Sequence, residues 1–362
     1  MRVKQVLKST VEPAVFERIA LTRLPELQKS GGLFKPAELS EGGGERTAVS
    51  ELRSSAVVLL GLTRADEVGL DTEISIGSLR TALLNATHGG EITVGDLGLA
   101  IWAESRADGS AVGELAEEIN GRIGGKSGKL PLEQVAWLAS GLSEARLRVG
   151  PGGALDTLLE QLARILLERA LASGFLSDAH HMFGGGMSPI GAQFHGLAAL
   201  NRLVRSEYPD SAPIRDRLLG ALLDLQRDDG AWPGVIDAKG GTTVAPYPML
   251  TVNQVAVGPM ALGGSGEALT GQESFDWEPV KRAISWATGG NGLGFDLIHE
   301  EEARIDHAIL PRRRLGPLGR SVGKATSRLG RRPADPPPED LILDPALTSE
   351  DMGWLLEAWA GR

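Results

Sequence analysis

Two adjacent histidines, His180 and His181, stand in the glycine-rich stretch DAHHMFGGGMSP, which runs from Asp178 to Pro189. Histidine changes its charge near neutral pH, so either side chain could give or take a proton in a catalytic step. Adjacent side chains point apart unless the backbone turns, which argues against a shared metal ion. The stretch therefore predicts a proton-transfer group. The alternative is a pair of surface-loop histidines without a role.

A second group of candidate residues lies in and directly after the long polar segment 227–252. Asp237 could act as a general acid or base, and Asn253 and Gln254 could orient a hydroxyl or carbonyl group. Tyr247 belongs to the same segment, which is long enough to fold over a pocket as a cover. The alternative for Asp237 is a turn residue, because aspartate is favoured in turns for its local hydrogen bonds.

A third group combines carboxylates with tryptophans. Glu133 and Trp137 are four residues apart and therefore share a helix face. Trp102 has Glu104 close to it in the sequence, and Asp351 follows a serine and a glutamate as in a helix-capping cluster. Two carboxylates facing each other across a cavity would be the acid–base groups of a sugar-acting enzyme. The alternative for each acid of this group is a helix-capping or surface position. We keep Asp351 as a candidate catalytic residue, and Glu133, Trp137 and Trp102 as candidate substrate contacts.

A basic stretch from Arg312 to Arg332 contains eight Arg or Lys residues and no acid, in a chain of net charge −10. It could contact a phosphate, a diphosphate head group or an anionic membrane surface. The alternative is a solvated loop. The acidic balance of the whole chain argues against general nucleic-acid binding, which needs a basic face.

The composition is that of a globular protein, with 42% hydrophobic and 23% charged residues in a chain of 362. The absence of cysteine excludes disulfides and thiolate chemistry. The N-terminal sequence has no apolar stretch of signal-peptide length, and no apolar run of transmembrane length occurs. We therefore expect a cytoplasmic protein, and the sequence implies neither a metal nor a cofactor.

Apolar stretches at helical spacing recur along the chain and are separated by turns rich in Gly, Pro and Asp. They group into consecutive pairs: 54–65 with 78–87, 94–106 with 111–123, 130–142 with 154–172, 188–204 with 213–226, and 252–262 with 278–288. The first member of each pair is the more uniformly apolar, as expected of an inner helix buried on both sides. The last stretch, 349–360, lacks a partner and can pair with the first, 12–28.

Six helical hairpins of this kind predict an all-α fold, an (α/α)6 toroid that spans residues 1–362 as a single domain. The alternative is an irregular helical bundle. Two regions do not fit the repeat: residues 30–50, a loose connector, and residues 311–340, a Pro/Gly/Arg-rich loop insertion. Residues 73–79 and 341–347 are the best candidates for strands.

Gln226, Gly230 and Trp232 follow a leucine-rich helix and have the spacing Q-x-x-x-G-x-W. This unit resembles the QW repeat of the terpenoid cyclase and protein prenyltransferase toroids. The resemblance implies that the unit fastens one helical hairpin to the next, with Trp232 as a clamp first and a substrate contact second. This chain has a single copy of the unit, and it lacks both the D-x-D-D and the D-D-x-x-D motifs.

Residues 188–300 also resemble an uncharacterised bacterial toroid family. The matching features are GAW at 230–232, Asp237, Tyr247–Pro248 and the helix VNQVAVGPMAL. Where that family has His, Asp and Met, this chain has Asn253, Val255 and Val257. If the replaced His or Asp acts in catalysis, this chain has lost that chemistry or performs a different one.

The resemblance implies an enzyme that acts on an isoprenoid-type substrate by acid–base chemistry in the central cavity. Aromatic residues make up only 4% of the chain, which is few for stabilising a carbocation. The alternatives are a carbohydrate-active toroid (a hydrolase, lyase or epimerase) and a non-catalytic binding or scaffold protein. The expected partner is a small molecule, either isoprenoid or saccharide.

Overall fold

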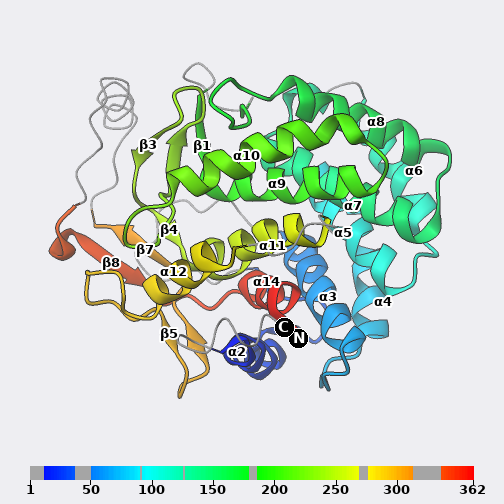
Figure 1. The fold of residues 1–362 in the computed structure, drawn as a ribbon. Coiled ribbons are helices and arrows are strands. Elements are labelled where there is room, and N and C mark those ends of the chain that lie inside the picture. The colour runs from blue at the N-terminus through cyan, green and yellow to red at the C-terminus, as the bar shows by residue number, and fades with distance from the viewer. Residues whose placement is uncertain are drawn as a thin grey trace.

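The computed structural model describes residues 12–36, 50–89, 92–124, 127–178, 186–268, 276–312 and 336–362. Twelve α-helices in these ranges form two concentric layers, which Figure 1 shows as an inner bundle with helices packed around its outside. None of the described helices is both long enough and apolar enough to cross a bilayer.

The inner layer is a closed ring of six helices. These are α3 (Glu51–Glu67), α5 (Val94–Ala107), α7 (Leu132–Val149), α9 (Ile190–Arg205), α11 (Gly258–Ala268) and α14 (Ser349–Trp359). Each packs against the next, and α14 packs against α3 to close the ring. Neighbouring helices run in the same direction, since Gly95 of α5 lies against Gln134 of α7 and Gly98 lies against Leu138. All six helices therefore begin at one end of the ring, which we call the mouth.

The outer layer places one helix behind each inner helix. The outer helices are α2 (Pro13–Leu27), α4 (Ile76–Ala86), α6 (Val112–Ile123), α8 (Gly153–Glu168), α10 (Ala212–Leu225) and α12 (Glu278–Ala287). The first outer helix, α2, packs against the last inner helix, α14. The structure thus confirms the six predicted hairpins and the pairing of the two chain ends. The all-α toroid is the correct fold class.

Glycines set the spacing of the inner ring on two sides. A Cβ added to Gly141 of α7 would overlap the carbonyl oxygen of Gly98 on α5. On the other side, a Cβ on Gly61 of α3 would lie 2.5 Å from the carbonyl oxygen of Gly353 on α14. These backbones are in direct contact, which no residue with a side chain allows. The Gly-rich character of the inner helices therefore reflects a narrow ring.

The QW-like unit fastens two outer helices to each other, as the sequence predicts. Gln226 follows α10, and its Nε2 donates to the carbonyl oxygens of Gly230 and Pro279, each at 2.7 Å. Because Pro279 belongs to α12, this amide joins two successive hairpins. The Trp232 indole is fully buried and donates to the carbonyl oxygen of Leu222 at 2.8 Å. The unit is a structural clamp.

Eight short strands lie along the connections between helices. They are β1 (Met187–Pro189), β2 (Val235–Asp237), β3 (Thr242–Ala245), β4 (Met249–Leu250), β5 (Ile298–His299), β6 (Arg304–Ile305), β7 (Ala308–Pro311) and β8 (Leu341–Asp344). They form three antiparallel sheets in the orders β1-β2-β3, β4-β7-β8 and β5-β6. Strands β1, β4 and β8 each come shortly before an inner helix, so these sheets lie at the mouth (Figure 1).

The two strand predictions had different outcomes. Residues 341–344 do form a strand, β8, which pairs with β7. The prediction for 73–79 was wrong, because the Ser75 hydroxyl accepts the N–H of Ser78 and starts helix α4 at Ile76. In the described part of the predicted connector 30–50, Phe34 forms an isolated β-bridge with Gln28, which lies just before the connector. Most of the predicted basic insertion lies outside the described residues.

Candidate functional site

The first two turns of the inner helices bring charged and polar side chains together at the mouth of the ring. Arg53 comes from α3, Asp96 from α5, Glu133 and Trp137 from α7, His195 from α9, and Glu350, Asp351 and Trp354 from α14. A single π-helical turn, Asn253–Val257, precedes α11 and adds Asn253. The order of the ring places α14 across from α7, and α3 across from α9. We call these nine residues the mouth cluster.

Arg53 provides a fixed positive charge in the mouth cluster. Its Nε and Nη2 donate to Glu350 Oε1 at 3.0 and 2.9 Å, and its guanidinium lies 4.3 Å from the centre of the Trp137 ring. Nη1 makes no hydrogen bond to a described residue and is not sealed from solvent. This nitrogen can therefore donate to a ligand. Because the guanidinium covers this face of Trp137, a ligand cannot stack on it in this arrangement.

Glu133 is the carboxyl group with the least compensation in the mouth cluster. It makes no hydrogen bond to any residue in the described ranges. Burial raises its pKa; Arg53 opposes this, while the negative charges of Glu350, Asp178 and Asp96 add to the rise. A carboxyl group whose pKa moves toward neutrality is suited to take a proton and return it. Glu133 is therefore the best candidate for a general acid–base group.

His195 lies deeper in the ring and is 5% exposed. Its imidazole packs edge-on to Trp137, with ring centres 5.5 Å apart, and contacts Trp354 at 5.2 Å. It has no hydrogen-bond partner among the described residues, and its nitrogens are not among the atoms sealed from solvent. Burial, helped by the charges of Arg53 and Arg202, lowers its pKa to about 3. The imidazole is therefore neutral at physiological pH and can donate one hydrogen bond and accept another.

The shifted pKa of His195 predicts a loss of stability in acid. The unfolded imidazole binds a proton near pH 6.5 and the folded one only near pH 3, so the unfolded chain binds more protons between these values. The contribution of His195 to stability is complete above pH 6.5 and is lost as the pH falls toward 3. Between pH 7.5 and 4.5 the wild type should lose about 2.5 kcal/mol more than the His195→Gln variant. Urea unfolding at both pH values measures this, and equal losses would contradict the buried, neutral state.

Asn253 is 9% exposed and begins the π-helical turn. Its side-chain amide lies directly against Gly191 on α9, the residue one turn before His195. No described residue forms a hydrogen bond with this amide, and its atoms are not sealed from solvent. Turns of this kind occur often at functional sites. Asn253 and His195 therefore present two neutral polar groups to the same region.

Asp351 pairs with a histidine that the sequence did not single out. Its Oδ2 lies 2.6 Å from His307 Nδ1, and its own N–H is capped by the Thr348 hydroxyl. The main chain fixes His307 from both sides, since its N–H donates to Asp344 and its carbonyl oxygen accepts from Thr251. A rigid His–Asp pair thus stands at the mouth beside Glu350.

The described part of the mouth is net negative. The carboxyl groups are those of Glu133, Glu350, Asp96, Asp178 and Asp351, and the groups that can carry positive charge are Arg53, Arg169 and His307. An excess of carboxylates repels phosphate and carboxylate ligands. The described residues of the mouth therefore favour an uncharged or cationic ligand.

An ion-pair network closes the opposite end of the ring. Arg106 of α5 pairs with Glu357 of α14 at 2.6 Å and with Glu67 of α3 at 2.7 Å. Above this network, the Arg202 guanidinium lies 4.1 Å from the centre of the Trp102 ring. The side chains of Arg106 and Glu357 are each only 7% exposed. The ring is thus filled at its base, and ligands can approach the described site from the mouth.

The structure separates eight of the eleven predicted site residues into three groups. Glu133, Trp137, Asn253 and Asp351 meet in the mouth cluster. Trp102 lies deeper, under Arg202, and is 1% exposed. Three further residues belong to the framework. Trp232 and Gln254 are bonded to each other, since the Gln254 amide accepts from Trp232 N–H at 2.8 Å and donates to its carbonyl oxygen at 3.0 Å. Tyr247 is 5% exposed and precedes a cis proline.

Asp237 is fully buried at the end of β2, beside the turn that leads to β3. A Cβ on Gly240 would lie 3.1 Å from its Oδ2, and its carbonyl oxygen accepts from Gly241. Asp237 thus lies next to a turn, on the strand that pairs with β1. His180 and His181 lie outside the described residues. The basic stretch after Arg312 also lies outside them. Arg312 itself is described, and its N–H donates to the carbonyl oxygen of Asp340.

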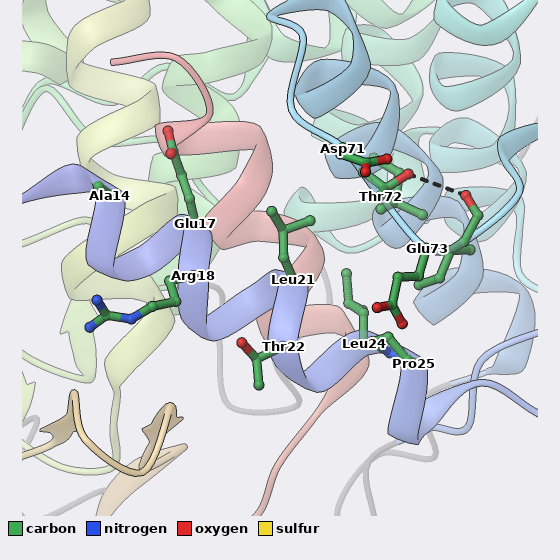
Figure 2. Close-up of a pocket in the computed structure, with 12 residues that line it drawn as sticks. Ala14, Glu17, Arg18, Leu21, Thr22, Leu24, Pro25, Asp71, Thr72 and Glu73 are labelled. Atoms are coloured by element: carbon green, nitrogen blue, oxygen red, sulfur yellow. Dashed lines mark hydrogen bonds between the residues drawn. The ribbon is translucent and has the colours of Figure 1, made fainter.

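A separate groove lies on the outside of the ring, between α2 and residues 71–74 (Figure 2). It has a volume of about 590 Å³ and is lined by Leu21 and Leu24 of α2 together with the acidic residues Asp71 and Glu73. No residue of the mouth cluster lines it. In the described ranges, no group of three or more His, Asp or Glu side chains is arranged to hold a metal ion.

The closed ring of six hairpins defines this chain as an (α/α)6 toroid protein. The sequence matches no protein-family model, and a search of curated proteins found no match.

Several solved structures share the fold over nearly the whole chain. A sugar epimerase from a ruminal bacterium has a TM-score of 0.62 at 10% identity, covering 95% of this chain and 97% of that one. A D-mannose isomerase has a TM-score of 0.61 at 13% identity, covering 98% and 97%. An unsaturated glucuronyl hydrolase specific for heparin has a TM-score of 0.62 at 13% identity, covering 96% and 95%. At these identities the likeness establishes the fold.

Proposed function

We propose that this chain is an enzyme that moves a proton on an uncharged saccharide, in the manner of an aldose isomerase or epimerase. The observation that carries the proposal is the mouth cluster. There a carboxyl group of raised pKa and a neutral imidazole of lowered pKa lie on either side of Trp137, and neither has a hydrogen-bond partner in the described chain. Titratable groups with strongly shifted pKa values that lie close together are typical of functional sites.

In the proposed reaction, the ionised Glu133 carboxylate takes the proton from the carbon next to the carbonyl group of the sugar. The C–H electron pair becomes the C=C bond of an enediolate, and the carbonyl oxygen gains the negative charge. Arg53 Nη1 and the neutral His195 donate hydrogen bonds to that oxygen. For isomerisation, Glu133 returns the proton to the neighbouring carbon while the hydroxyl proton of the second oxygen passes to the first, so that the C=C bond becomes the new C=O bond. For epimerisation, the enediolate turns its other face to Glu133, the proton returns to the same carbon, and the original C=O bond re-forms.

The chemistry of the site favours a saccharide over an isoprenoid. The mouth cluster consists mainly of charged and amide groups, whereas an isoprenoid chain needs an apolar lining. Its net negative charge also opposes a diphosphate group. The fold neighbours named above include a sugar epimerase and a D-mannose isomerase, which supports the same direction.

Hydrolysis of a glycosidic bond is the second candidate reaction. Glu350 and Asp351 begin α14, across the ring from Glu133 on α7. A carboxylate pair placed across a cavity is the arrangement that glycosidases use. Asp351, however, is bonded to His307, and Glu350 to Arg53. Both are therefore already engaged, which is why we place this reaction second.

Incubation of the protein with D-glucose, D-mannose, N-acetylglucosamine and cellobiose in D2O tests the proposal. Isomerase or epimerase activity places deuterium on the carbon next to the carbonyl group, and proton NMR detects the loss of that signal. New reducing ends from cellobiose without deuterium exchange would establish the hydrolytic reaction instead. Neither exchange nor hydrolysis, together with no detectable binding of any of the four sugars, would refute the proposed function.

A further inference from the structure

Gly191 allows the Asn253 amide to lie on the backbone of α9. A Cβ added at Gly191 would lie 2.9 Å from Asn253 Nδ2, 3.1 Å from Oδ1 and 3.3 Å from Cγ. The whole amide plane therefore rests against the helix where a side chain would otherwise project. A side chain at 191 would therefore displace the amide.

The amide lies one helical turn before His195 on the same face of α9. Residues four apart on a helix are separated by about 6 Å along its axis. Asn253 and His195 are at least nine-tenths buried, and both lack a hydrogen-bond partner among the described residues. Their polar atoms are not sealed from solvent, so both side chains can form hydrogen bonds with a ligand that enters the mouth.

The two groups match a hydroxylated ligand in chemistry as well as in position. A side-chain amide and a neutral imidazole each offer both a donor and an acceptor. A hydroxyl group also donates and accepts, whereas an anion only accepts and an ammonium group only donates. The lowered pKa of His195 keeps the imidazole in this two-way state.

From this geometry we infer that Asn253 and His195 form a hydroxyl-reading pair for the substrate, and that Gly191 is the residue that makes the pair possible. The inference rests on the proposed function and adds to it a determinant of specificity. Asn253 binds a sugar hydroxyl near the mouth, and His195 binds the adjacent substrate oxygen one turn deeper.

Two variants and one matched control test the pair. Gly191→Ala displaces the amide, and Asn253→Leu removes it while keeping its approximate volume. Gly113→Ala on the outer helix α6 is the control, because a Cβ there meets nothing within 4 Å. Thermal unfolding of all three variants establishes that each is folded before binding is measured.

Binding of D-glucose, D-mannose, N-acetylglucosamine and cellobiose is measured by saturation-transfer NMR and calorimetry. For any sugar that the wild type binds, Gly191→Ala and Asn253→Leu should weaken binding 10-fold or more, and Gly113→Ala should leave it unchanged. Wild-type affinity in both mouth variants would overturn the pair while leaving the proposed function in place. If the wild type binds none of the four sugars, the proposed function fails first, and the pair fails with it.

Deoxy analogues of the bound sugar identify the hydroxyl that the amide reads. A site built to bond a hydroxyl group strongly rejects the analogue that lacks it, because the buried partner is left unpaired. The wild type should therefore disfavour one deoxy analogue about 100-fold or more. In Asn253→Leu that preference should fall below 10-fold for the same analogue. An undiminished preference would assign the selectivity to other residues.

Discussion

Replacing Glu133 by glutamine should reduce the rate of deuterium exchange into the sugar by about 10²- to 10⁴-fold, the usual contribution of a general acid–base group. The amide keeps the shape of the side chain but cannot take a proton. Because Glu133 has no hydrogen-bond partner in the described chain, the variant should fold normally. Sugar binding should change much less than the rate, so the loss should fall on kcat.

The matched control is Glu160→Gln, which replaces an exposed glutamate on the outer helix α8. It removes the same charge from the protein without touching the mouth cluster, and its exchange rate should equal that of the wild type. If Glu133→Gln retains more than half of the wild-type rate, Glu133 is not the group that moves the proton.

Replacing Gly141 by alanine should destabilise the protein by about 3 kcal/mol or more, the range of severe overpacking in a rigid core. The added methyl group would overlap the carbonyl oxygen of Gly98, and a backbone cannot move aside as a flexible side chain can. Helices α5 and α7 would have to separate. Urea unfolding, followed by far-UV circular dichroism, measures the free energy of unfolding.

Gly113→Ala is again the appropriate control, because alanine favours a helix over glycine by about 1 kcal/mol where space is free. It should leave the protein as stable as the wild type or slightly more stable. A loss of less than 1 kcal/mol in Gly141→Ala would show that the ring can widen, and the contact between Gly98 and Gly141 would then not define its radius.

Much of the fold could be predicted from the sequence because its signals are local. Paired apolar stretches at helical spacing indicate hairpins, and the Gln226–Gly230–Trp232 unit indicates how two of them are joined. The strands at the mouth could not be found in this way. Strand β1 is three residues long, and its pairing with β2 depends on a register between residues about 50 positions apart. Ser75 shows the opposite failure, where a short alternating pattern concealed a helix cap.

The site was predicted only in part, because its members are brought together by the ring and not by the sequence. Glu133 and Asn253 could be selected for their residue types near helix starts. His195 sits in an otherwise apolar inner helix and looks like a core residue; its role depends on the indoles of Trp137 and Trp354, which come from other helices. Arg53 gave no signal, since its position over Trp137 exists only after the ring has brought α3 near α7.

The ion pairs of Arg106 with Glu357 and Glu67 affect how a reactant can enter the ring and how a product can leave it. Because the base of the ring is filled, the reactant must enter and the product must leave through the mouth. A released product would then compete with the incoming reactant, and product inhibition should be competitive in form. A long polysaccharide could not pass through the ring from end to end, so the substrates of the proposed reaction would be free sugars and the ends of chains.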